Sequence, residues 1–299
     1  MKLLHGVTVA MITPFDEKGK VKENVLEELT NFLIEKGVDC LYPCGTTGEM
    51  FRLSLEERKL IGEIIVNTTQ KRVPVHLHVG CMRYKDTLEL AEHAYEIGAD
   101  GIGVVTPAYF TANDRELENY YVSIAERLPQ DFPIYLYNIP QLAGNDLTPA
   151  VVENILAQTD NIVGIKYSEA DLLRTNEYLQ FEKNDFHVLH GTDNLFLGLL
   201  ALGCEGTVSG ISGIFPEPYV AIYEAFKDGD REKARKMQSL ANKFNKLLRS
   251  GSNMAFFKEA LKFRGIDAGY MRRPQLELTK DQKEDLYENL DTLTKELSF

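Results

Sequence analysis

The stretch Ile162-Val163-Gly164-Ile165-Lys166 decides the fold, because it is a short apolar run of the kind found in strands that are buried on both faces. A helical pattern precedes it at residues 149–158, and another follows at residues 171–182. A short strand between two helices is the βα unit from which parallel sheets are built. A charged residue at the end of such a strand also makes Lys166 a candidate for function.

The same alternation extends outward along the chain in both directions. Signals for helix starts and ends support it: Ser54 is a candidate N-cap, Thr148-Pro149 places proline at a first helical position, and glycines follow residues 36, 97 and 202. The predicted strands cover residues 6–12, 40–44, 73–79, 101–106, 133–138, 162–167, 187–190 and 206–211, and the predicted helices cover residues 23–36, 55–70, 84–97, 114–127, 149–158, 171–182, 194–202 and 216–227. Eight strands alternating with eight helices predict a (β/α)8 TIM barrel.

Helical patterns at residues 231–249, 254–264 and 280–297 follow the last of these units. Neither a shift in composition nor a Gly/Ser linker separates them from the barrel. We therefore expect a single structural unit, with the barrel over residues 1–228 and C-terminal helices over residues 229–299 packed on it.

Composition narrows the possible partners. The chain has 44% apolar and 26% charged residues, which is typical of a globular domain. Its net charge of -12 repels phosphate backbones and anionic lipids, so we expect neither nucleic acid nor a membrane as partner. The N-terminus lacks the apolar stretch of a signal peptide, and we expect a cytoplasmic protein whose four cysteines are reduced thiols.

The carboxyl ends of barrel strands carry the chemistry in this fold, so they supply the site candidates. A buried lysine has a lowered pKa, and its neutral amine attacks a carbonyl to form a Schiff base. Lys166 fits this role, although a lysine at a strand end also reaches solvent or pairs with a carboxylate. Tyr137 ends the preceding strand and supplies a phenol for proton transfer, or else it is a core aromatic residue.

The glycine-rich segment Gly45-Thr46-Thr47-Gly48-Glu49 follows the second predicted strand. Its two hydroxyls and converging backbone N–H groups suit a carboxylate or a keto acid. The alternative interpretation is an ordinary glycine turn before the next helix.

Taken in order, Gly-Thr-Thr-Gly-Glu at 45–49, Tyr-Asn-Ile-Pro at 137–140 and Gly-Ile-Lys at 164–166 closely resemble the dihydrodipicolinate synthase and N-acetylneuraminate lyase family. The similarity extends from Thr13-Pro14-Phe15 to Arg273-Pro274. The resemblance implies a class I aldolase that binds pyruvate covalently as an imine, needs no metal or organic cofactor, and forms a homotetramer.

Position by position, the resemblance implies that Lys166 forms the Schiff base and that Tyr137 shuttles protons. Thr46 and Thr47 would hold the pyruvate carboxylate, and Tyr109 would be lent across a subunit interface to complete a relay with Thr46 and Tyr137. The expected substrate-binding residues are Gly45, Thr46, Thr47, Ser168, Gly191, Asp193, Asn194, Val208 and Ser209.

Departures from the family pattern indicate the subfamily. The synthase branch places an arginine two residues after the Tyr-Asn-x-Pro proline, where this chain has Leu142, so the acidic substrate of a synthase would lose its main anchor. The positions of the lysine-feedback pocket also differ, and lysine inhibition is not expected. Segments 137–144 and 78–81 look like those of the lyase branch.

These comparisons favour the cleavage or formation of a 2-keto-3-deoxy sugar acid from pyruvate and an aldehyde. The first alternative is dihydrodipicolinate synthesis, and the second, from another class, is a catalytically silent barrel that binds a keto acid. His76 and His78 share a strand face with metal-like spacing, but the sequence offers no further ligands, and we expect no metal site.

Overall fold

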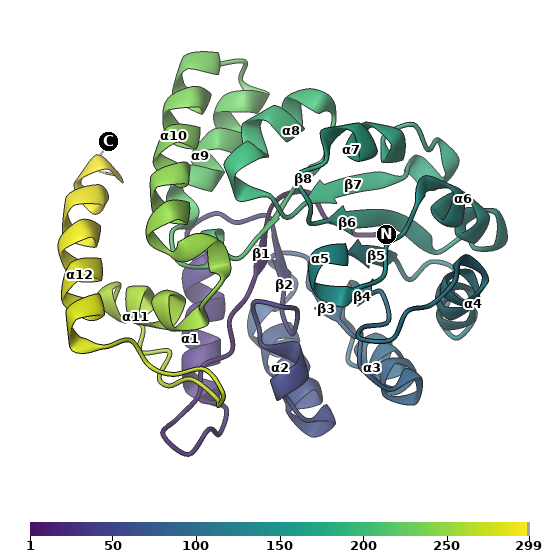
Figure 1. Cartoon of the computed structure of the whole chain (residues 1–299), viewed down its shortest axis with the longest axis horizontal. Helices are drawn as coiled ribbons and strands as arrows, with labels where there is room; N and C mark the ends of the chain where they lie inside the picture. Colours follow the sequence, from purple (N-terminus) through teal and green to yellow (C-terminus); the bar gives the residue numbers. More distant parts are fainter. Residues whose placement is uncertain (298–299) are drawn as a thin grey trace.

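The computed structural model describes residues 1–297, and it confirms the predicted (β/α)8 barrel (Figure 1). All strand pairs are parallel, and the sheet order β2-β1-β8-β7-β6-β5-β4-β3 returns to its start through a bridge between Leu41 and Val75. The strands are β1 (Gly6–Ala10), β2 (Cys40–Tyr42), β3 (His76–His78), β4 (Gly101–Val105), β5 (Ile134–Asn138), β6 (Ile162–Tyr167), β7 (His187–His190) and β8 (Gly206–Ser209).

Helices follow the strands and surround the barrel. They are α1 (Glu23–Glu35), α2 (Leu55–Thr69), α3 (Tyr84–Glu96), α4 (Asp114–Ala125), α6 (Pro149–Gln158), α7 (Leu172–Tyr178), α8 (Phe196–Leu202) and α9 (Pro216–Lys227), with a short additional helix α5 (Pro140–Ala143) after β5. The differences from prediction lie mostly at element ends. The last strand stops at Ser209, for example, because its hydroxyl accepts the Ser212 N–H and the chain turns there.

The predicted helix signals are present in the structure. The Ser54 hydroxyl accepts the Glu57 N–H, while the Glu57 carboxylate accepts the Ser54 N–H, so both ends of a capping box are satisfied. Thr148 caps α6 with its hydroxyl, which accepts the Val151 N–H. Gly37, Gly98 and Gly203 have the left-handed backbone expected where a helix ends before a strand.

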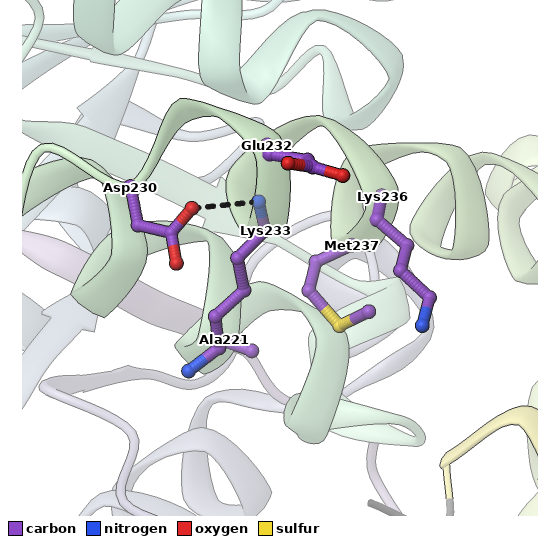
Figure 2. Close-up of a pocket in the computed structure, with 6 residues that line it drawn as sticks. All are labelled: Ala221, Asp230, Glu232, Lys233, Lys236 and Met237. Atoms are coloured by element: carbon purple, nitrogen blue, oxygen red, sulfur yellow. Dashed lines mark hydrogen bonds between the residues drawn. The ribbon is translucent and has the colours of Figure 1, made fainter.

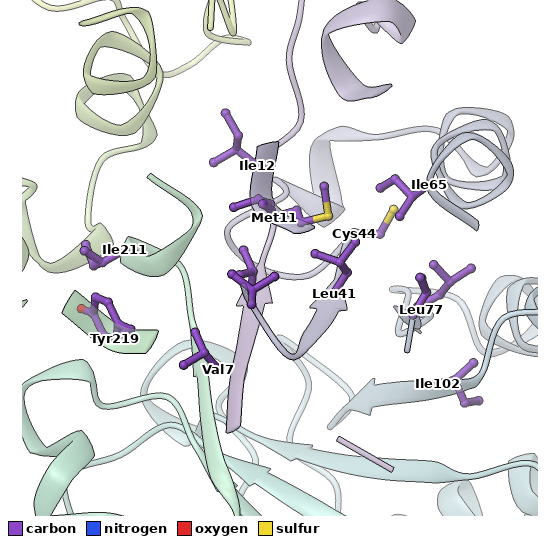
Figure 3. Close-up of a cluster of buried hydrophobic side chains, with 14 of the residues drawn as sticks. Val7, Met11, Ile12, Leu41, Cys44, Ile65, Leu77, Ile102, Ile211 and Tyr219 are labelled. Atoms are coloured by element: carbon purple, nitrogen blue, oxygen red, sulfur yellow. The ribbon is translucent and has the colours of Figure 1, made fainter. Parts of the chain in front are cut away.

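Among the described residues, two layers of apolar side chains and a small third cluster around Met50 and Tyr137 make the core. The larger layer lies between the strands and the helices, and Figure 3 shows part of it around Val7, Leu41 and Leu77. The smaller layer fills the barrel interior and includes Tyr42 and Tyr135. Filling the barrel leaves room for a ligand only at its rim.

The C-terminal helices are α10 (Arg231–Leu247), α11 (Met254–Phe263) and α12 (Lys280–Thr294). Phe257 on α11 and Leu286 on α12 belong to the same apolar layer as the barrel strands. Figure 1 shows these helices, in light green to yellow, along one side of the barrel. Residues 298 and 299 of the predicted C-terminal segment lie outside the described residues. Within residues 1–297, no helix has the length and apolarity needed to span a membrane.

Candidate active site

A cavity of about 290 Å³ opens at the carboxyl ends of the strands, where barrel enzymes bind their substrates. Residues of β1, β5, β6 and β8 line it, together with the segments that follow β2, β5, β6, β7 and β8, the loop between α10 and α11, and α11 itself. A larger hollow of about 450 Å³, drawn in Figure 2, lies between α9 and α10 on the outside of the barrel. It is lined mainly by exposed side chains such as Glu232 and Lys233, and no strand end contributes to it. The rim cavity is therefore the candidate active site.

Lys166 is the cation of this cavity, and it is only 4% exposed. Its amine nitrogen lies 3.9 Å from the ring centroid of Tyr137 and 4.9 Å from that of Tyr42. Within residues 1–297 no carboxylate pairs with it, so the structure does not support the salt-bridge alternative. An amine without an ionic partner keeps its donors and its lone pair available to a ligand.

Tyr137 stands beside this lysine because β5 and β6 pair in a register that places Tyr137 opposite Lys166. The Tyr137 hydroxyl lies 3.1 Å from the Thr46 hydroxyl, within hydrogen-bond distance. His78 contacts the Tyr137 ring edge to face, with 5.8 Å between the ring centroids. Lys166, Tyr137 and Thr46, which come from three distant parts of the chain, thus meet at one point of the rim.

The loop that carries Thr46 and Thr47 is held on both sides. Thr13 donates its hydroxyl proton to the Gly48 carbonyl at 2.8 Å. Glu49 has a left-handed backbone, and its buried carboxylate lies 3.1 Å from the Lys258 amine of α11. Among the hydrogen bonds of residues 1–297, the backbone N–H groups of Thr46 and Thr47 donate none. Two free N–H groups next to two hydroxyls form a suitable cradle for a carboxylate.

The wall that faces this cradle is polar. Ser168, Gly191 and Asp193 all line the cavity. Gly191 is needed here because a side chain at this position would come within 2.2 Å of the Ser168 hydroxyl. Burial raises the pKa of Asp193 to about 7, while the Ser209 hydroxyl and the Lys166 charge oppose this shift. Its Oδ1 atom is buried without a hydrogen-bond partner in the described chain, so it is available to a ligand hydroxyl.

Most of the candidate residues come together in this cavity, and four do not. The cavity contains Thr46, Thr47, Tyr137, Lys166, Ser168, Gly191, Asp193 and Val208. Gly45 lies behind the cradle, with its carbonyl accepting the Met50 N–H, and Ser209 turns to Ser212. Asn194 is exposed outside the lining, and Tyr109 is 81% exposed and does not line the cavity of its own chain.

Residues that the sequence did not point to complete the lining. Ser250, Gly251 and Ser252 belong to the loop between α10 and α11, and Phe257 belongs to α11. Arg249, Ser250 and Gly251 all have positive φ angles of 50° to 71°, which is a strained conformation for the first two. Ser250 lines the cavity and Arg249 precedes it, so their strained backbone is a structural signal of this wall, but the sequence Arg-Ser-Gly-Ser contains no motif that predicts it.

The two histidines of β3 form hydrogen bonds with backbone groups of neighbouring segments. The Val105 N–H donates to Nε2 of His78, and Nδ1 of the same ring donates to the Cys44 carbonyl. His76 donates to the Lys2 carbonyl. In residues 1–297 no group of three or more potential metal ligands comes together, and the four cysteines are free thiols.

Comparisons with known proteins show which sequences and folds this chain is similar to. The 4-hydroxy-tetrahydrodipicolinate synthase of Syntrophus aciditrophicus is 36% identical over 284 residues, which cover 95% of this chain and 96% of the relative. The Escherichia coli prophage protein YagE, solved in complex with pyruvate, superposes with a TM-score of 0.91 at 30% identity and covers 98% and 99% of the two chains. A catalytic lysine mutant of the Ruminococcus gnavus sialic acid aldolase gives a TM-score of 0.92 at 27% identity and covers 99% and 100%.

A (β/α)8 barrel with an amine-bearing cavity at its rim, similar throughout to aldolases and synthases, defines the class of this protein as a carbon–carbon lyase. The chain belongs to the dihydrodipicolinate synthetase family, whose model matches residues 3–293. Enzymes of this family bind pyruvate covalently as a Schiff base and use no metal cofactor.

Proposed function

We propose that the protein is a pyruvate-dependent class I aldolase that cleaves or forms a 2-keto-3-deoxy sugar acid whose only charged group is its carboxylate, as N-acetylneuraminate lyases do. The observation that carries the proposal is the charge of the cavity. Among the described residues that line it, Lys166 is the only cation, and it is committed to the keto group. The cradle serves one carboxylate, and nothing in the lining attracts a second anionic group.

In the proposed cycle, the neutral amine of Lys166 attacks the keto carbon of the substrate. The new carbon–nitrogen bond replaces the carbon–oxygen bond, and water leaves as the iminium forms. Removal of a proton from the C4 hydroxyl then breaks the C3–C4 bond. The aldehyde departs, and the electron pair is taken up by the iminium as an enamine. Protonation at C3 and hydrolysis release pyruvate and the free lysine.

Tyr137 is the proposed proton carrier in this cycle. Its hydroxyl lies 3.1 Å from the Thr46 hydroxyl, so a proton has a direct path between them. The carboxylate of the substrate would sit on the N–H and hydroxyl groups of Thr46 and Thr47. This arrangement places the keto carbon near Lys166 and leaves the rest of the substrate facing the polar wall.

The part of the cavity away from the cradle suits an aldehyde that carries hydroxyl groups. Asp193, Ser168, Ser250 and Ser252 line it, and each carries a group that hydrogen-bonds to hydroxyls. Leu142 also lines the cavity and is 65% exposed. It cannot bind a carboxylate, which argues against aspartate semialdehyde as the partner of pyruvate. The competing function, 4-hydroxy-tetrahydrodipicolinate synthesis, is supported by the name of the Syntrophus relative.

Borohydride trapping tests the mechanism. The purified protein is incubated with pyruvate and borohydride, and intact mass and peptide mapping locate the adduct. We expect a reduced pyruvyl group on Lys166 and none in Lys166→Ala, whose folding is checked by circular dichroism. Cleavage rates for a series of 2-keto-3-deoxy sugar acids are then compared with condensation of pyruvate and aspartate semialdehyde. Faster condensation with the semialdehyde would assign the protein to the synthase branch.

We also propose a homotetramer in which Tyr109 enters the site of a neighbouring subunit. Tyr109 has a φ angle of 76°, a strained value for a non-glycine residue, and it forms an exposed edge-to-face pair with Phe110. These rings are 81% and 74% exposed, which is unusual for large aromatic side chains on a monomer. The cytoplasmic location stays a prediction from the sequence.

A further inference from the structure

We propose that Tyr42 is a positioning residue for Lys166: its ring face holds the lysine amine at the cavity floor without engaging it in a hydrogen bond. The inference rests on the proposed role of Lys166 in forming the Schiff base. It assigns a part in the reaction to a side chain that neither the sequence motifs nor the cavity lining single out.

The geometry around the amine is the first step. Tyr42 on β2 and Tyr137 on β5 both present ring faces to Lys166 on β6, with centroid distances of 4.9 Å and 3.9 Å to its nitrogen. In the described chain this nitrogen has neither a hydrogen bond nor an ion pair. Two aromatic faces are therefore what holds a flexible, nearly buried side chain in place.

The chemistry of the nitrogen explains why rings suit this position. A carboxylate partner would favour the protonated amine and occupy its donors, which opposes nucleophilic attack. An aromatic face attracts the cation weakly and accepts no proton from it. An aromatic face also stabilises the iminium cation. The iminium nitrogen carries one N–H group where the ammonium ion carries three, so it has fewer hydrogen bonds to gain from water.

The environment of Tyr42 shows that its ring matters more than its hydroxyl. The side chain is fully buried, and the hydroxyl oxygen has no hydrogen-bond partner among the described residues. The hydroxyl occupies a notch at Gly103, where an added Cβ would come within 1.9 Å of it. Tyr42 does not line the cavity, so it acts on the substrate only through Lys166.

Three variants distinguish the effect of the Tyr42 ring on the trapping rate from the effects of its hydroxyl and of general core packing. Tyr42→Phe keeps the ring face, and Tyr42→Leu removes it. Tyr135→Leu is the matched control, because Tyr135 is also fully buried in the barrel interior but contacts His76 and the Leu4 N–H instead of the lysine. For each variant, the initial rate of borohydride-trapped adduct on Lys166 is measured by intact mass at subsaturating pyruvate, after circular dichroism has confirmed the fold.

We expect Tyr42→Leu to trap pyruvate about tenfold more slowly than the unmodified protein, the effect of losing a desolvated cation–π contact. Tyr42→Phe should stay within about twofold, and so should Tyr135→Leu despite a lower melting temperature. Equal trapping by Tyr42→Leu and the unmodified protein would overturn the inference and leave the proposed function standing. A loss in Tyr42→Phe as large as in Tyr42→Leu would also overturn it, since the hydroxyl would then carry the effect. An unmodified protein that forms no adduct would overturn the proposed function itself.

Discussion

At the scale of single residues, the variant Tyr137→Phe tests whether imine formation and proton transfer depend on different groups. The ring that contacts Lys166 remains in this variant, while the hydroxyl that lies 3.1 Å from Thr46 is lost. We expect pyruvate trapping to continue and kcat for cleavage to fall about 10²-fold or more. Steady-state rates with a sugar acid, set beside trapping rates, check this. Unchanged turnover would remove Tyr137 from the relay.

Leu142 offers a second residue-scale test, this time of substrate choice. Leu142→Arg adds a guanidinium at the cavity mouth, which suits a carboxylate. We expect kcat/KM for aspartate semialdehyde to rise about tenfold or more relative to that for the sugar acid. Leu142→Ala is the control for lost bulk and should leave the ratio near its starting value. A ratio that moves equally in both variants would contradict the proposed role of charge at this position.

His76 gives a pH-dependent contribution to stability that can be isolated. Burial lowers the pKa of His76 from 6.5 to about 4, so between these values the unfolded chain takes up a proton that the folded chain does not. The free energy of unfolding therefore falls as the pH drops from about 6.5 to about 4. We expect His76→Gln, which keeps a donor for the Lys2 carbonyl, to flatten the pH slope by up to about 1.4 kcal/mol per pH unit. Urea unfolding of both proteins across this range, at one protein concentration, measures the difference.

At the scale of elements, a buried ion pair joins α11 to the loop after β2. Lys258 lies 3.1 Å from Glu49, with the two side chains 2% and 1% exposed. Lys258→Met leaves the Glu49 carboxylate with Arg52 as its remaining partner, and we expect a loss of about 3 kcal/mol in the free energy of unfolding. The double variant Glu49→Gln/Lys258→Met should lose less than the sum of the single variants, as urea titrations would show. Additive losses would mean that the two groups act independently.

The elements also show what the sequence could and could not predict. Periodicity and capping residues predicted every barrel strand and its helix, because burial on both faces and helix ends each impose a local pattern. The sequence could predict that Lys166, Thr46 and Thr47 lie at the rim, because the end of a strand leaves a local pattern. The wall formed by Ser250 and Ser252 was missed because its approach to the cavity depends on how α10 packs on α9, a long-range contact that leaves no local pattern. Tyr42 was read as part of an apolar strand for the same reason.

At the scale of the whole molecule, the proposed exchange of Tyr109 between subunits predicts complementation. Lys166→Ala oligomers, expected to be inactive, and Tyr109→Phe oligomers, expected to be weakly active, are dissociated together and reassociated. Random pairing should restore about a quarter of the original activity, because half of the pairs are mixed and one of the two sites in each mixed pair is intact. Sites built from a single chain would show no recovery. Reassociating each variant alone gives the baseline.

The C-terminal wall of the cavity has a consequence for how the enzyme is made. Thr46, Tyr137 and Lys166 leave the ribosome well before Ser250 and Ser252, and Lys258, the partner of Glu49, follows later still. Because Ser250 and Ser252 line the cavity, we expect the substrate site to be complete only after the end of the chain has docked on the barrel.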